Sequence, residues 1–191
     1  MGIPQTKEGL FTYADYYSWD DEERWELIDG VAYNMSPAPV RRHQQALGGL
    51  FRAIAAITDR GPCETYPAPF DVRFSADEST DTVVQPDISV FCDETKLDDR
   101  GAVGAPDLVV EILSPATSHK DMTAKLALYE RHGVREYWIV NADAPWVMVY
   151  RLGSDRRYAK PDYYRAGESV PSDVLGGEEI DLAEALPRRP A

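Results

Sequence analysis

Two acidic residues interrupt short apolar runs of the sequence, and they are the first candidates for chemistry. Asp87 follows Pro86 within the run 83–91, and Glu111 lies among Val, Ile and Leu residues in 107–113. An ionised carboxylate that is buried without a partner costs several kcal/mol or more. Each acid therefore needs a cation, a metal or a proton, and the identity of that partner decides what the two acids can do.

Both acidic runs alternate in the way that a strand requires. Neighbouring side chains of a strand point to opposite faces of the sheet. In 83–91, Gln85 and Asp87 share one face, and the residues at 84, 86, 88 and 90 on the other face are all apolar. In 107–113, Glu111 shares its face with Val and Leu residues. We therefore expect each strand to have one core face and one face that carries an acid.

If these two strands are neighbours, Asp87 and Glu111 lie close together. Two buried like charges raise the pKa of one of them strongly or require a cation. An all-oxygen site of this kind suits Mg²⁺, with Mn²⁺ as the alternative, because Mg²⁺ binds one or two carboxylates and keeps several waters. The competing interpretation places Glu111 at a strand edge, paired in water with an Arg or Lys.

A lysine on the helix expected after 107–113 could supply positive charge to the same place. Lys125 lies at the margin of an apolar helical stripe that includes Leu126 and Tyr129. A lysine there either extends its ammonium to water or meets a buried acid, and Asp121 one turn earlier offers a surface pair instead. Two acids that hold a metal and one lysine that stabilises charge on a phosphate are what phosphodiester hydrolysis needs.

The elements that must position these residues follow the order helix, strands, helix, strands. That order predicts an α/β fold with a mixed central sheet flanked by helices, and Asp29-Gly30 predicts an N-terminal β-hairpin. The expected helices are 13–19, 40–58, 115–132 and 182–186, and the expected strands, besides the hairpin, are 66–74, 83–91, 107–114, 135–140 and 146–152.

Length and composition predict one globular domain that spans 1–191. Hydrophobic residues make up 43% of the 191, which is enough to bury a core. No apolar run approaches the roughly 18 residues of a membrane helix, so we expect no membrane partner. The first residues lack the pattern of a secretory signal, and Cys63 and Cys92 are expected to be reduced thiols, so a cytoplasmic location is predicted.

The charge balance is acidic, with 20 Lys and Arg against 33 Asp and Glu and a formal net charge of −13. This argues against a passive coat for nucleic acid, which needs a basic surface. It leaves room for a local basic cleft.

The order of the acids is typical of one nuclease class. Pro86-Asp87, followed by Glu111 on the next apolar strand, resembles the PD-(D/E)XK nuclease superfamily. The lysine that this superfamily usually has two residues after the acid is replaced here by Leu113. Lys125 and Tyr129 form K-x-x-x-Y on the following helix, which resembles the variant in which the lysine has moved to the helix.

Longer segments carry a more specific resemblance. In chain order they are WELIDGVAYNMSPAP, APFDVRF, VVQPDISVF, GAPDLVVEILSPATS and KDMTAKLALYERHGVREYWIVN. They resemble the Uma-type family of restriction-endonuclease-like proteins over roughly 10–186, which we take as the core of the domain, with flexible ends. The resemblance implies a restriction-endonuclease-like α/β fold, supports Asp87, Glu111 and Lys125 as the site, and draws attention to Glu26 and His43.

Four residues are candidates for accessory roles. Glu26 could be a third acid that reaches the metal, or a solvated strand acid. His43 could bind substrate phosphate, with capping or surface polarity as the alternative. Gln85 could orient water or a base, and Tyr129 is either accessory or a core residue. For Asp71 a structural role is favoured over a functional one.

We therefore predict an Mg²⁺-dependent endonuclease that hydrolyses phosphodiester bonds, with DNA as the expected substrate. Asp87 and Glu111 are the expected metal ligands, and Lys125 is expected to stabilise charge and position the attacking water. The alternative is a catalytically silent module that binds nucleic acid or a protein partner through the same cleft. A third possibility is a metal hydrolase of a small phosphate ester. The sequence leaves open DNA against RNA, endo against exo action, and the oligomeric state, a homodimer included.

Overall fold

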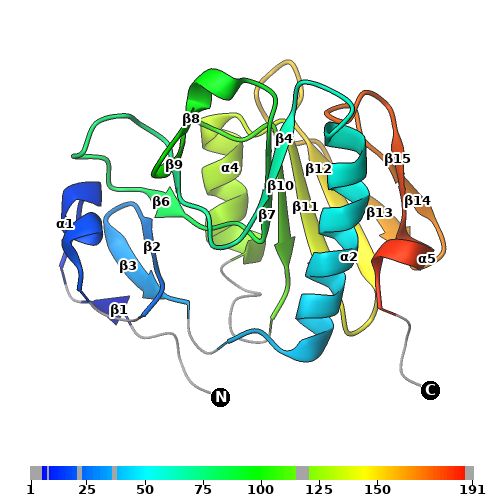
Figure 1. Cartoon of the computed structure of the whole chain (residues 1–191), viewed down its shortest axis with the longest axis horizontal. Coiled ribbons are helices and arrows are strands. Elements are labelled where there is room, and N and C mark those ends of the chain that lie inside the picture. The colour runs from blue at the N-terminus through cyan, green and yellow to red at the C-terminus, as the bar shows by residue number, and fades with distance from the viewer. Residues whose placement is uncertain (1–5, 8, 21–22, 36–37, 115–120, 188–191) are drawn as a thin grey trace.

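The computed structural model describes residues 6–7, 9–20, 23–35, 38–114 and 121–187, which form an α/β structure with two large mixed sheets (Figure 1). In the central sheet, β10 and β11 are parallel and the other neighbouring pairs are antiparallel. Its strands, in spatial order, are β13 (Asp162–Arg165), β12 (Trp146–Arg151), β11 (Glu136–Asn141), β10 (Leu108–Ile112), β7 (Ile88–Phe91) and β4 (Glu64–Pro67).

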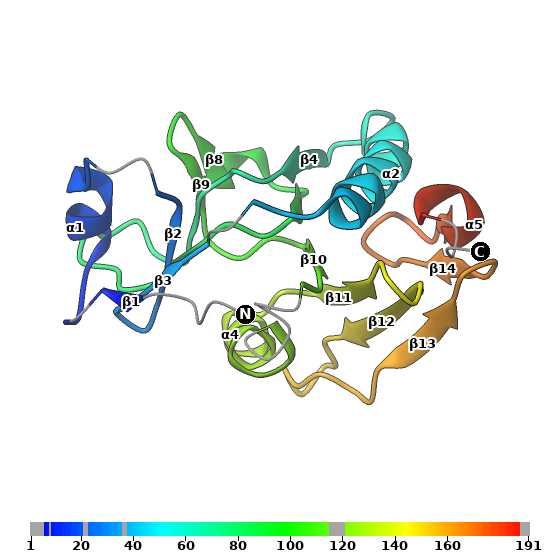
Figure 2. The same cartoon turned by 90° about the horizontal axis from the view of Figure 1, so that it is seen from below.

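Helices cover both faces of this sheet. Figure 2 shows α2 (Arg41–Thr58) and α4 (Leu126–His132) on opposite sides of β10. Leu50 of α2 belongs to the same buried cluster as Val110, whereas Leu128 of α4 clusters with Val109. The sheet flanked by helices is therefore confirmed. The face of β10 that carries Glu111 is also enclosed, because α4 packs over it.

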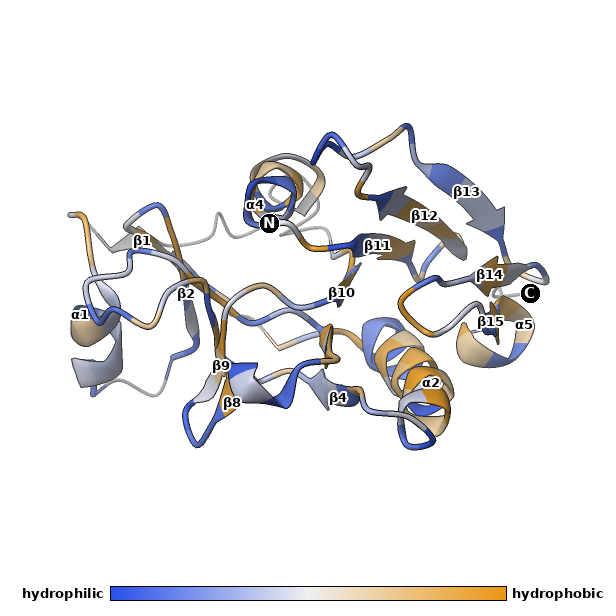
Figure 3. Cartoon of the chain, turned by 90° about the horizontal axis from the view of Figure 1, so that it is seen from above, coloured by the Kyte–Doolittle hydropathy of each residue, from blue (hydrophilic) through white to orange (hydrophobic). Residues whose placement is uncertain are grey.

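The hydropathy of the elements matches this arrangement. Figure 3 shows hydrophobic residues along α2 and β12, whereas β13 at the edge of the sheet is largely hydrophilic. An exposed edge strand with polar side chains resists pairing with other chains. No helix within the described ranges is long and apolar enough to cross a membrane.

The second sheet lies beside α1 (Tyr13–Ser18) at the left of Figure 1. Asp29 and Gly30 join β2 to β3 with φ values of 50° and 77°, as the primed turns of hairpins require. The expected N-terminal hairpin is thus confirmed. The strands, in spatial order, are β1 (Thr6–Lys7), β3 (Val31–Asn34), β2 (Trp25–Ile28), β6 (Val83–Val84), β5 (Val72–Arg73), β9 (Gly101–Val103) and β8 (Leu97–Asp98).

Two segments that the sequence predicts as single strands each pass from one sheet to the other. The run 66–74 divides into β4 of the central sheet and β5 of the second sheet, and 83–91 divides into β6 and β7. Pro86 lies at the second crossing and has no N–H to donate to a ladder, so a continuous central strand is excluded there. The crossing leaves Gln85 and Asp87 between the two sheets.

The remaining helices and strands lie near the two ends of the chain or are short connecting segments. Thr12 and Asp15 form a capping box that starts α1, and β14 (Ser169–Pro171), β15 (Glu179–Asp181) and α5 (Leu182–Ala185) lie beside α2 (Figure 1). Gly49 permits this contact, since a Cβ there would lie 2.0 Å from the carbonyl oxygen of Ala185. Short helical segments also occur at η1 (Glu94–Lys96) and η2 (Asp121–Lys125), and η2 is a π-helix. The first part of the helix expected over 115–132, residues 115–120, lies outside the described residues.

The structure joins Cys63 and Cys92 in a disulfide. The two cysteines flank the cross-strand pair Glu64 and Phe91, where edge strand β4 meets β7. The expectation of two reduced thiols is therefore wrong, because strand pairing brings together residues that are 29 apart in sequence. The predicted cytoplasmic location loses the support that it drew from reduced thiols and stays a prediction.

Candidate functional site

The pairing of β7 with β10 brings the two predicted acids together. Ile88 is the partner of Val110, and continuing this antiparallel register places Asp87 opposite Glu111. Asp87 Oδ2 also accepts a hydrogen bond from the backbone N–H of Ile112 at 2.7 Å. The condition that the two acidic strands be neighbours is therefore met.

Lys125 lies between two carboxylates that come from different sheets. Its Nζ is 2.7 Å from Glu111 Oε1 and 2.8 Å from Glu26 Oε1. Lys125, Glu111 and Glu26 are only 2%, 4% and 0% exposed. The ammonium neither extends into water nor serves a solvated strand edge, so Lys125 meets a buried acid, as one of the two interpretations predicted. The side chain of Asp121 lies outside the described part of the chain.

Tyr129 shares the carboxylate that Lys125 contacts. Its hydroxyl donates to Glu111 Oε1 at 2.7 Å, from a position one helical turn after Lys125. Burial and the neighbouring charge of Glu111 raise the pKa of Tyr129 well above its usual range. The phenol therefore stays protonated and remains a donor. Tyr129 is therefore both a core residue and a member of a buried polar cluster, whose other members are Lys125, Glu111 and Glu26.

Glu26 enters the cluster from the hairpin strand β2. Its Oε1 accepts a hydrogen bond from the backbone N–H of Gln85 at 3.0 Å, in addition to the contact with Lys125. All four residues of β2 are buried. The alternative of a solvated strand acid is therefore wrong, and the crossing at Pro86 explains how a second sheet reaches the acids of the first.

His43 approaches from the first turn of α2. Its Nε2 lies 3.2 Å from Asp87 Oδ2, and the side chain is buried. The alternative of a surface residue is therefore wrong, since His43 contacts a candidate site acid. Its predicted role in binding phosphate stays a prediction.

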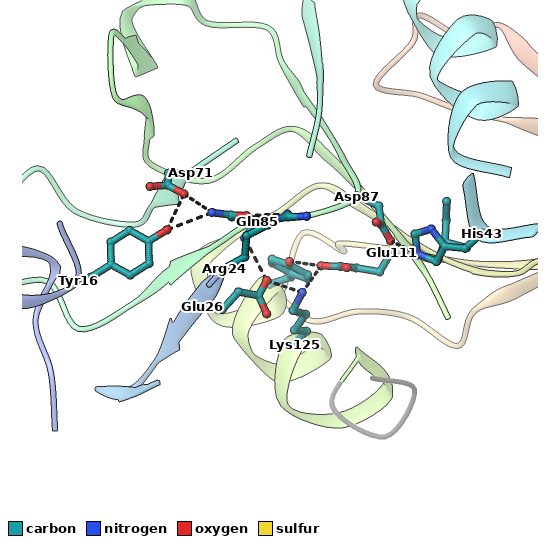
Figure 4. A network of polar contacts seen from close by, with 11 residues as sticks. Tyr16, Arg24, Glu26, His43, Asp71, Gln85, Asp87, Glu111 and Lys125 are labelled. Atoms are coloured by element: carbon teal, nitrogen blue, oxygen red, sulfur yellow. Dashed lines mark hydrogen bonds and ion pairs between the residues drawn. The ribbon is translucent and has the colours of Figure 1, made fainter. Parts of the chain in front are cut away.

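The backbone N–H of Gln85 contacts Glu26 of the cluster, whereas the side chain of Gln85 bonds to other residues. The side-chain Oε1 accepts from Arg24 Nη2 at 2.7 Å, and Nε2 donates to Asp71 Oδ1 at 2.8 Å and to the hydroxyl of Tyr16 at 3.1 Å. Figure 4 shows this side chain directed away from Asp87. The prediction that the two residues share a face is wrong, because the strand is interrupted between them.

The side chain of Gln85 thus belongs to a second network with Arg24, Tyr16 and Asp71. Two of its members, Arg24 before the hairpin and Tyr16 on α1, were not predicted from the sequence. Asp71, for which a structural role was favoured, precedes β5. The contacts of this network depend on how α1 and β2 dock onto the sheet crossing, which no local pattern reveals. The one usable signal was the density of aromatic residues between 11 and 19.

The atoms of the site that could bind a metal ion are all carboxylate oxygens. Asp87, Glu111 and Glu26 carry three negative charges when ionised, against one ammonium from Lys125. Both contacts of Asp87 use Oδ2. Within the described ranges, no group of three or more His, Cys, Asp or Glu side chains is arranged as a ready metal site. The residues fit a cation that takes one or two carboxylates and keeps its waters, which is the habit of Mg²⁺.

The chain is an α/β protein with two large mixed sheets, and it shares its fold with a nuclease-like neighbour. A crystal structure described as a putative nuclease belonging to DUF820, from Anabaena variabilis ATCC 29413, has the same fold. It superposes with a TM-score of 0.73 at 20% sequence identity, and the match covers 92% of this chain and 97% of that chain.

Residues 13–183 match the model of the Uma2 family, which is described as "Putative restriction endonuclease". The chain belongs to this family, and the resemblance inferred from its motifs is confirmed. An uncharacterized protein of Synechocystis sp. (strain ATCC 27184 / PCC 6803 / Kazusa), slr1290, is 26% identical over 175 residues, which cover 90% of this chain and 87% of that protein. The family membership supports a nuclease-like function.

Proposed function

We propose that the chain is a metal-dependent endonuclease that hydrolyses phosphodiester bonds, with DNA as its substrate. The observation that carries the proposal is the convergence of Lys125, Glu111 and Glu26, from three separate elements, beside Asp87 in the crossing between β6 and β7. Placing one ammonium between buried carboxylates has a large desolvation cost, which stability alone does not require. Buried ionisable side chains that contact one another in this way, together with Tyr129 and its raised pKa, are typical of functional sites.

Asp87 and Glu111 are the proposed metal ligands. A divalent cation held there would polarise the phosphoryl oxygens and lower the pKa of a bound water. The chain's own contribution is to fix the ligands. The amide of Ile112 and the imidazole of His43 hold Asp87 Oδ2, and the hydroxyl of Tyr129 holds Glu111 Oε1. These contacts keep both carboxylates in one orientation before substrate arrives.

Lys125 is the proposed electrostatic stabiliser. Its ammonium is held by Glu26 and Glu111, so it needs little reorganisation when a phosphate approaches. A preorganised donor of this kind stabilises charge that grows on the phosphate in the transition state. Glu26 then acts as a positioning residue, because it fixes the ammonium and is itself fixed by the amide of Gln85.

One observation favours a second candidate function. Lys125 already pairs with two carboxylates, so the cluster could serve as a structural tie in a catalytically silent module that binds nucleic acid or a protein. The two candidates differ in whether the acids bind a divalent cation.

Calorimetric titration with Mg²⁺ and with Mn²⁺ separates them. Asp87→Asn is the informative variant, since an Asn oxygen can still accept from Ile112 while the negative charge is removed. We expect the wild type to bind one cation and the variant to bind it at least ten-fold more weakly. Equal affinity in both proteins would overturn the assignment of Asp87, and no binding in either would favour the silent module.

A further inference from the structure

A pocket of about 230 Å³ opens beside the candidate site. Four of its seven lining residues are aromatic, and the others supply two charged side chains and one amide. The lining residues are Tyr16, Tyr17, Trp19, Glu23, Arg24, Trp25 and Gln85.

The pocket and the candidate site share a wall. Gln85 lines the pocket, while its backbone N–H holds Glu26 of the site. Trp25 of the pocket directly precedes Glu26 on β2. In Figure 4, Arg24 and Gln85 lie between Tyr16 on one side and the carboxylates around Lys125 on the other. A ligand that places a phosphate near Lys125 could therefore place an adjoining group in the pocket.

The aromatic rings of the pocket support one another. The ring centroid of Trp19 is 5.6 Å from that of Tyr16 and 5.8 Å from that of Trp25. Tyr17 remains 59% exposed, and the guanidinium of Arg100 lies 4.5 Å from the centre of its ring. Fixed aromatic rings at a surface are the platforms on which nucleobases stack.

The polar groups of the pocket are also held in place. Arg24 donates to Gln85 Oε1 through Nε at 3.1 Å and Nη2 at 2.7 Å. Gln85 in turn donates to Asp71 and Tyr16. Glu23, opposite in charge to Arg24, contacts the amide of Asn34. A guanidinium and a carboxylate in one pocket match the acceptor and donor groups on the edges of a base.

The volume sets the size of the ligand. Sites for drug-sized molecules range from about 300 to 1,000 Å³, and this pocket of about 230 Å³ is smaller. It suits one planar ring system instead of a whole nucleotide. A base that is paired and stacked within a duplex cannot enter such a pocket without leaving the stack.

We infer that this pocket binds one unpaired nucleobase next to the phosphodiester bond that is cut. The substrate class is then single-stranded nucleic acid, or a duplex with a locally unpaired base. This inference rests on the proposed nuclease function, because the shared wall gives the pocket its place beside the scissile phosphate.

Binding is measured with Asp87→Asn protein, so that cleavage does not interfere. The probes are a fluorescently labelled single-stranded oligonucleotide of mixed sequence, the same strand in a duplex, and an oligonucleotide of equal length made of abasic sites. We expect the single strand to bind most tightly, and the abasic strand about ten-fold or more weakly, as the loss of base stacking implies. Equal affinity for the abasic strand, or a preference for the duplex, would overturn the inference.

A matched pair of variants locates the binding. Tyr17→Ala, in the same Asp87→Asn background, removes an exposed ring from the pocket. Tyr163→Ala removes a comparably exposed ring, 51% against 59%, from β13. We expect Tyr17→Ala to weaken binding of the single strand about ten-fold and Tyr163→Ala to leave it unchanged. Equal effects of the two variants would contradict the assignment.

The fluorescence of Trp19 gives a reading that is independent of affinity. We expect the single strand to quench tryptophan emission, and Trp19→Phe to remove most of the quenching while Trp146→Phe does not. If the single strand quenches Trp19 more than the abasic strand does, and the wild type cleaves no nucleic acid, the pocket is upheld and the nuclease function is rejected. Cleavage by the wild type without any dependence on bases would uphold the nuclease function and reject the pocket.

Discussion

At the scale of single residues, the charge of Lys125 compensates two carboxylates that water hardly reaches. Its place at the margin of an apolar stripe was visible in the sequence, and so was Glu111 on the preceding strand. The second carboxylate was not predictable as a partner, since Glu26 comes from a hairpin of the other sheet. The consequence of removing Lys125 is therefore larger for folding than its sequence position suggests.

Lys125→Met should lower the free energy of unfolding by about 3–5 kcal/mol, because it leaves two buried carboxylates without their cation. Urea titration measures the change. Lys125→Arg keeps the charge and should lose less, and Lys125→Met combined with Glu26→Gln should recover part of the loss. If Lys125→Met stays within about 0.5 kcal/mol of wild type, as surface substitutions usually do, the buried cluster is not as described.

Asp71 gives a prediction for pH dependence. Burial raises the pKa of this carboxyl above its ordinary value of 3.8. The folded state then holds the proton to higher pH than the unfolded state, so stability falls as pH rises from 3.8 through the raised pKa. Asp71→Asn can still accept from Tyr16 and Gln85 but does not titrate.

The difference in unfolding free energy between Asp71→Asn and wild type should therefore rise with pH across this interval, and then stay constant. Urea titrations at several pH values test it. Parallel pH profiles for the two proteins would show that Asp71 is not perturbed.

At the scale of elements, the sequence predicted most helices and strands but not their division between two sheets. Periodicity shows that 83–91 is extended. It does not show that Pro86 interrupts the ladder at a crossing between sheets. For this reason the predicted orientation of the Gln85 side chain is wrong. The predicted proximity of Asp87 and Glu111 required only that their two strands be neighbours, which they are.

The disulfide between Cys63 and Cys92 ties edge strand β4 to β7, whose first residue follows Asp87. A cross-link between residues 29 apart should contribute about 2–4 kcal/mol by restricting the unfolded chain. Dithiothreitol should lower the unfolding free energy of the wild type by that amount. The double variant Cys63→Ser, Cys92→Ser should have the lower value from the outset and not respond to reductant. A wild type that is indifferent to reductant would show that the bond does not stabilise the fold.

At the scale of the whole molecule, a net charge of −13 opposes the approach of nucleic acid. Binding should therefore be weak in EDTA and fall steeply between about 50 and 200 mM salt. Mg²⁺ should strengthen it, because the cation offsets the negative charge locally. Fluorescence anisotropy of a labelled strand measures both effects. A tight complex in EDTA that ignores salt would instead support the silent binding module.

The central claim is tested most directly by cleavage of labelled single-stranded and duplex DNA and RNA, with Mg²⁺ or EDTA, by the wild type and by Asp87→Asn. We expect the wild type to cut a nucleic acid only with the metal. Asp87→Asn, while folded, should be slower by on the order of 10²-fold or more, comparable to the loss of one preorganised group. Cleavage that survives in EDTA or in Asp87→Asn would contradict the proposed site, and no cleavage of any of these substrates by metal-loaded wild type would contradict the nuclease function itself.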